Sequence, residues 1–76
     1  MQKVYVSVIC KCDKEGVTLP IRICWDDGRS WNIKRVLHAC TAAHHEFEGI
    51  RYTVKIGSAE KYLYRDGQQW YVGCSP

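Results

Sequence analysis

Alternation of apolar and polar residues at every second position is the feature that most constrains the fold of this chain. In KVYVSVICKC (residues 3–12) the even-numbered positions carry only valine and cysteine. A period of two is that of a β-strand, whose successive side chains point to opposite faces of a sheet. Similar patterns recur along the chain and predict strands at residues 4–12, 18–26, 30–38, 50–56, 59–65 and 69–73.

Glycine-containing turns separate these segments. DDGR (residues 26–29) and RDGQ (residues 65–68) both contain Asp-Gly, which is typical of hairpin turns because glycine readily adopts a positive φ. Five to six short strands favour a mainly β fold, either a small antiparallel curled sheet or an SH3-like barrel. At 76 residues, we expect residues 1–76 to form one small domain.

The segment between residues 30 and 48 permits a second interpretation. Its apolar residues also fall at the helical spacing i, i+3, i+4 and i+7, at Ile33, Val36, Leu37 and Cys40. A helix over residues 32–47 would make the fold α+β. A strand over residues 30–38 instead requires a β-bulge near Arg35 or Val36 to keep both Ile33 and Leu37 inside.

The apolar phase of the predicted strands identifies the expected core: Val6, Val8, Ile21, Ile23, Ile33, Leu37, Val54, Ile56 and Trp70. Tyr52 shares the phase of Val54, whereas strand 59–65 is ambiguous because either its tyrosines or Leu63 would fit an inward phase. Cys10 and Cys12 lie on the apolar phase of the first strand. We expect them to be small buried apolar residues rather than a redox or metal pair.

Two long stretches, ICWDDGRSWNIKRVLHACTAAH and IRYTVKIGSAEKYLYRDGQQWYV, together resemble a family of short uncharacterised proteins of Gram-positive anaerobic bacteria. Its members share a W-x-D-G-R turn, an I-x-R-V-L segment, a Y-T-V-x-I-G strand and a closing W-[FY]-V strand. The resemblance spans residues 4 to 73. In that family the segment matching residues 38–44 usually contains a proline, which disfavours a continuous helix and favours a strand over 30–38. The family implies no known activity.

The stretch HACTAAHHEFEG (residues 38–49) is rich in side chains that bind metals or catalyse reactions. The candidate ligands for zinc or another divalent ion are Cys40, His44, His45 and Glu48. Their spacing matches no zinc signature, so we expect a polar loop with no metal and no other cofactor. His38, Cys40 and Glu46 could in principle form a catalytic group. No nucleophile motif accompanies them, and we expect no enzyme activity.

The cysteine count and the pattern of the N-terminal residues indicate the cellular compartment of the protein. The five cysteines are an odd number, and the N-terminal residues alternate instead of forming the apolar region of a signal peptide. No apolar run approaches the length of a membrane span. We therefore expect a cytoplasmic protein with mostly reduced thiols and no membrane partner.

Basic and aromatic residues alternate in the second half of the chain, and the net charge is +3. The candidate nucleic-acid contacts are Lys34, Arg35, Arg51, Lys55, Lys61 and Arg65. Small barrels can bind single strands by stacking bases on exposed rings in a basic groove. We favour instead rings that fill the core and charges that face solvent, because Tyr52 alternates inward.

The sequence therefore predicts a small non-catalytic binding or interaction module, either a monomer or a weak homodimer, with a protein or a single-stranded nucleic acid as candidate partner. The alternatives are a weak single-stranded nucleic-acid-binding barrel and a metal- or thiol-dependent module.

Overall fold

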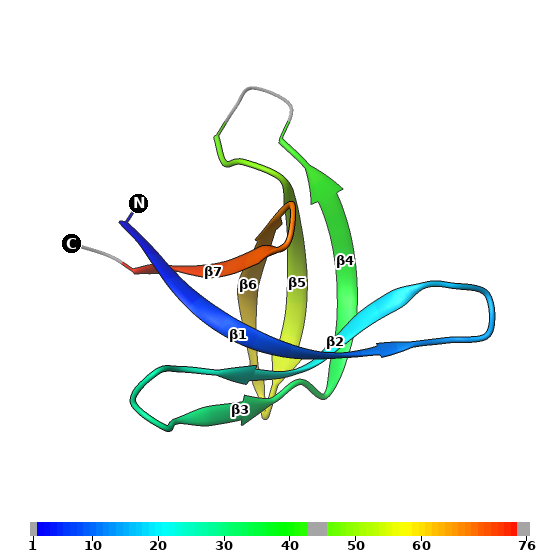
Figure 1. Cartoon of the computed structure of the whole chain (residues 1–76), viewed down its shortest axis with the longest axis horizontal. Coiled ribbons are helices and arrows are strands. Elements are labelled where there is room, and N and C mark those ends of the chain that lie inside the picture. The colour runs from blue at the N-terminus through cyan, green and yellow to red at the C-terminus, as the bar shows by residue number, and fades with distance from the viewer. Residues whose placement is uncertain (1, 43–45, 75–76) are drawn as a thin grey trace.

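The chain folds as a curled antiparallel β-sheet (Figure 1). The computed structural model describes residues 2–42 and 46–74 and, within them, seven strands and no helix. The strands are β1 (Gln2–Cys12), β2 (Thr18–Cys24), β3 (Ser30–Asn32), β4 (Arg35–Thr41), β5 (Ile50–Ile56), β6 (Ala59–Asp66) and β7 (Gln69–Cys74). The mainly β prediction is confirmed. The alternative helix over residues 32–47 is wrong, since β4 occupies its centre.

The strand order in the sheet is β3-β2-β1-β7-β6-β5-β4. The predicted strand over residues 30–38 divides into β3 and β4, which form the two ends of the sheet, so there is one strand more than expected. Two connecting residues link these ends. The Ile33 N–H donates to the Ile21 carbonyl at 2.9 Å, and the Lys34 N–H donates to the Lys55 carbonyl at 2.7 Å. The ends meet through this link and not through a strand ladder, which makes the sheet a half-barrel.

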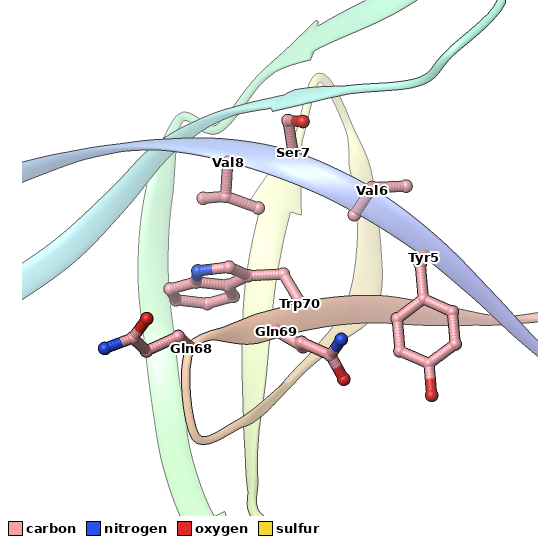
Figure 2. Close-up of a pocket in the computed structure, with 7 residues that line it drawn as sticks. All are labelled: Tyr5, Val6, Ser7, Val8, Gln68, Gln69 and Trp70. Atoms are coloured by element: carbon pink, nitrogen blue, oxygen red, sulfur yellow. The ribbon is translucent and has the colours of Figure 1, made fainter.

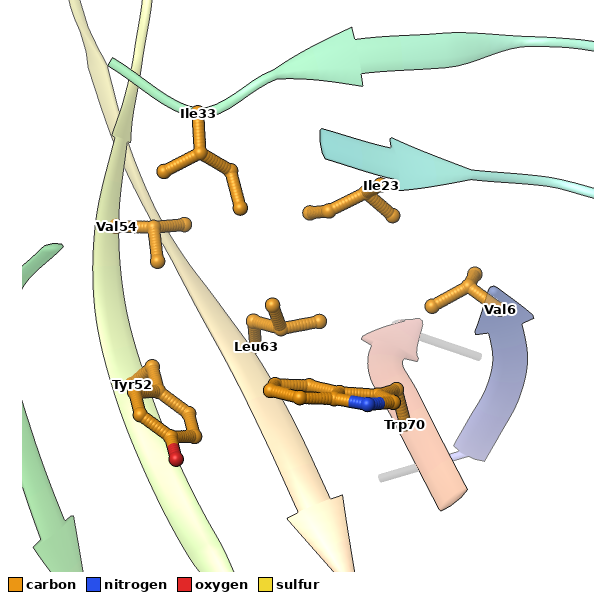
Figure 3. Close-up of a cluster of buried hydrophobic side chains, with 7 residues drawn as sticks. All are labelled: Val6, Ile23, Ile33, Tyr52, Val54, Leu63 and Trp70. Carbon is orange, nitrogen blue, oxygen red and sulfur yellow. The ribbon is translucent and has the colours of Figure 1, made fainter. Parts of the chain in front are cut away.

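The core lies inside the curl of the sheet (Figure 3). Its buried residues are Val6, Ile23, Ile33, Tyr52, Val54, Leu63 and Trp70. Val8 and Ile56 pack against this cluster and are partly buried. The predicted core is therefore largely confirmed, and the structure places Leu63, rather than the tyrosines of β6, on the inward phase.

Two predicted core residues, Ile21 and Leu37, are exposed, and β-bulges explain both errors. In the β1–β2 ladder Ile9 pairs with Arg22 and Cys10 with Pro20, so Ile21 is an extra residue of β2. The β4–β5 ladder contains a second bulge. Its register shifts between Val36 and His38, which leaves Leu37 unpaired. A bulge was expected near Arg35 or Val36, but it turns Leu37 outward instead of inward.

The prediction that Cys10 and Cys12 are buried is also wrong, since both are exposed. β1 pairs with β7 only as far as Val6, and beyond that residue it pairs with β2 alone. The end of the β1–β2 hairpin, residues 9–21, consequently projects from the sheet as an arm (Figure 1). Within the described residues no second layer covers the apolar side chains of this arm.

Candidate functional site

β4, β5 and β6 have a core-side face and an outer face. Val54 is fully buried in the core, and directly paired residues of an antiparallel sheet share a face. Val36 and Lys61, the partners of Val54, therefore lie on the core side. The outer face carries the alternate residues of the three strands: Arg35, His38 and Cys40 of β4, Arg51, Thr53 and Lys55 of β5, and Glu60, Tyr62 and Tyr64 of β6.

An aromatic cluster covers the end of this face nearest β7. The rings of Tyr64 and Tyr71 stack with centroids 4.9 Å apart, and Phe47 packs against Tyr64 with centroids 5.3 Å apart. Tyr5 of β1 adds an edge contact to Tyr71. The Tyr71 hydroxyl donates a hydrogen bond to the Glu48 carbonyl at 2.9 Å, which ties the segment before β5 to the sheet. Tyr64 and Tyr71 are buried, so this cluster forms a small second core.

Arg51 is held within the same face by two rings. Its guanidinium carbon lies 4.9 Å from the centroid of Phe47 and 4.4 Å from that of Tyr62. Its Nε atom is buried without a hydrogen-bond partner in the described part of the chain. Burying a donor without a hydrogen-bond partner costs free energy, and cation–π attraction to both rings offsets part of that cost. Arg51 is therefore a structural clamp rather than a free cation, while Tyr62 remains 52% exposed.

Three of the predicted contacts gather at the other end of the face. Lys34, Arg35 and Lys55 line a hollow of about 370 Å³, named the basic hollow below. Pairing in the sheet explains this convergence, since Arg35 is directly opposite Lys55 and the backbone of Lys34 is bonded to that of Lys55. Glu60 lies opposite Lys55 on β6 and partly offsets the positive charge. Such a cluster of cations attracts anions.

The other predicted contacts do not join the basic hollow. Lys61 belongs to the core-side phase, opposite Val54. The guanidinium of Arg65 lies 5.4 Å from the centroid of the Trp70 ring, and its Nε donates to the Gly67 carbonyl at 2.9 Å. The exposure of Tyr62 was not predicted, because alternation left the phase of β6 open.

The candidate metal ligands are only partly described. His44 and His45 lie outside the described residues, and Cys40 is part-buried on β4. The Glu48 carboxylate pairs with the Lys3 ammonium at 3.1 Å. This contact lowers the pKa of Glu48 and raises the pKa of Lys3.

In the ranges 2–42 and 46–74 no group of three or more potential metal ligands occurs. Of the residues considered for catalysis, His38 and Cys40 share the outer phase of β4, and Glu46 lies in the segment before β5. The expected absence of a metal, another cofactor and enzyme activity stays a prediction.

Comparison of the chain with protein-family models, with curated proteins and with solved structures found no match. The resemblance to the family of Gram-positive anaerobes therefore stays a prediction. No helix capable of crossing a membrane occurs among the described residues.

Proposed function

We propose that this protein is a small non-catalytic binding module of the cytoplasm whose ligand is a single-stranded nucleic acid. The observation that carries the proposal is the basic hollow, because three cations converge on the same face that exposes the Tyr62 ring. In a single-stranded nucleic acid the phosphates bind positive charge, whereas the bases stack on flat aromatic rings. The outer face offers both within one stretch of β5 and β6.

The proposed arrangement follows from the register of the sheet. Lys55 is opposite Glu60, and Tyr62 lies two residues further along β6, a distance of about 7 Å at the usual rise of a strand. A phosphate in the basic hollow would thus leave an adjoining base within reach of the Tyr62 ring. His38 and Thr53 lie in the same cross-strand row as Tyr62 and offer further polar contacts.

The binding should be weak and sensitive to salt. Net charge is only +3, and Glu60 places a carboxylate beside the basic hollow. Affinity that depends on phosphate contacts falls steeply as the salt concentration rises. Removing the Glu60 charge should therefore tighten binding, a result that follows only if the ligand is an anion near Lys55.

The test is fluorescence anisotropy with a labelled oligothymidine of about 10 nucleotides, a length within the site size of small barrels. We expect binding at low salt that Arg35→Glu and Tyr62→Ala both weaken and that Glu60→Gln strengthens. Losing one stacked base should cost about 1–3 kcal/mol, or roughly five- to 150-fold in affinity. Losing a phosphate contact should reduce the slope of log affinity against log salt by about 0.7.

The matched control is Lys14→Glu, which makes the same change in charge at an exposed residue of the turn after β1. It should weaken binding far less than Arg35→Glu. Equal effects of the two variants would mean that only overall charge matters. That result, or an absence of binding at low salt, would refute the proposed interface.

A further inference from the structure

One edge of the arm has no partner strand. β1 pairs with β7 through residues Gln2–Val6 and with β2 through residues Ser7–Cys12. The edge of Ser7–Cys12 that faces away from β2 is therefore unpaired in the described part of the chain. Free backbone N–H and C=O groups along such an edge form a template for another strand.

The arm also exposes an unusual amount of apolar surface. Four of the eight large apolar residues that are exposed in the described structure belong to it, namely Ile9, Val17, Leu19 and Ile21. Ile9 lies within the unpaired edge itself and is 48% exposed. Exposed apolar residues grouped beside an open edge are typical of an interaction site.

We propose that the arm pairs with the arm of a second copy of this chain, antiparallel, across a two-fold axis that passes between the two Ile9 residues. In this register Ile9 faces Ile9, Val8 faces Cys10, and Ser7 faces Lys11 of the second copy. The inference is independent of the proposed nucleic-acid binding, because no residue of the basic hollow belongs to the arm.

The sequence of the edge is complementary to itself in this register. Lys11 is the only charged residue between Ser7 and Cys12, and it faces a serine hydroxyl rather than another cation. A shift by two residues along the strand would place Ile9 against Lys11 instead. Apolar cross-strand pairs stabilise a sheet, whereas like charges directly opposite each other destabilise it. Charge and apolar matching therefore favour a second copy as the occupant.

A hollow at the start of the edge provides room for the second arm. It has a volume of about 450 Å³ and lies between β1 and the start of β7 (Figure 2). Val6 is the last β1 residue to pair with β7, and the hollow separates Ser7 and Val8 from Gln68 and Gln69. In the proposed register Lys11 of the second copy arrives at this point, opposite Ser7, and the new ladder ends there because Val6 already pairs with Trp70. The second arm would thus continue the line of β7 without displacing it.

The overlap is short, so the dimer should be weak and should form between about 10 µM and 1 mM. Sedimentation velocity under reducing conditions, over that range of concentrations, measures it directly. We expect Ile9→Lys to raise the dissociation constant at least about tenfold, because it removes the central apolar pair and places two cations opposite each other.

The control variant is Val17→Lys, which introduces the same side chain in the same arm but outside the paired edge. Val17 and Ile9 are both 48% exposed, so neither change should unfold the protein, and circular dichroism checks this. Val17→Lys should dimerise like the wild type. A wild-type chain that stays monomeric up to the highest concentration would overturn the proposal, as would an Ile9→Lys variant that dimerises normally.

Discussion

Ile21 and Ile23 provide a direct test of the bulge in β2. They are the same residue type, two positions apart on one strand, and simple alternation places both in the core. In the structure Ile23 is 1% exposed and Ile21 is 42% exposed. Replacing each with alanine should therefore destabilise the protein by very different amounts.

The expected loss in free energy of unfolding follows from the burial of each side chain. Ile23→Ala removes three carbons from the core, worth about 2.4 kcal/mol at about 0.8 kcal/mol for each buried CH₂ group. The cavity left behind adds to this, and comparable substitutions cost about 2–5 kcal/mol in total. Ile21→Ala removes partly solvated carbons and should cost about 1 kcal/mol or less. A domain of 76 residues has a free energy of unfolding of roughly 4–11 kcal/mol, so Ile23→Ala consumes a large part of it.

The stability of both variants is measured by urea and thermal unfolding, which tryptophan fluorescence and circular dichroism monitor. A loss of about 3 kcal/mol should lower the Tm of Ile23→Ala by roughly 12–24 °C, whereas Ile21→Ala should shift it by less than about 8 °C. Equal shifts would show that the bulge is misplaced and that Ile21 is part of the core. A larger shift for Ile21→Ala would refute the register of β1 and β2 altogether.

Two further predictions concern the segment before β5. Gly49 has a φ of +82°, and a Cβ there would collide with the Arg65 carbonyl oxygen, so Gly49→Ala should cost at least about 2 kcal/mol in denaturant unfolding. Gly16→Ala, at a φ of +84° but in open space, should cost less, and equal costs would contradict the close approach. Lys3 lowers the pKa of Glu48, so their pair stabilises the fold above the usual carboxyl pKa and is lost as the pH falls through the lowered value. Thermal melts should show a slightly steeper loss of stability between about pH 5 and pH 3 for the wild type than for Glu48→Gln, and identical profiles would contradict the contact.

The sequence predicted the strands better than it predicted what covers them. Alternation located five strands within a few residues, merged β3 and β4 into one, and identified Val6, Ile23, Ile33, Val54 and Trp70 as core. It failed at the two bulges, because one inserted residue reverses the phase of everything before it. The position of the extra residue shows only in the pairing with the neighbouring strand, and the pattern of a single strand does not contain it.

The candidate site was predictable only as a set of residue types. The six basic residues were identified from their alternation with aromatic ones, yet three gather at the basic hollow and three do not. What brings Arg35 and Lys55 together is the β4–β5 register, which is fixed by the bulge at Leu37. Clamping of Arg51 between Phe47 and Tyr62 likewise depends on how the segment before β5 crosses the sheet.

The sequence alone determined that this chain forms short antiparallel strands joined by glycine turns, because a period of two and Asp-Gly signals are local properties of the backbone. Only the tertiary structure decided how far along each strand the apolar face is buried. Val8 and Cys10 occupy the same phase of β1, but only Val8 has the curled sheet packed against it, while Cys10 projects on the arm. Burial requires a second surface, and that surface comes from strands distant in the sequence.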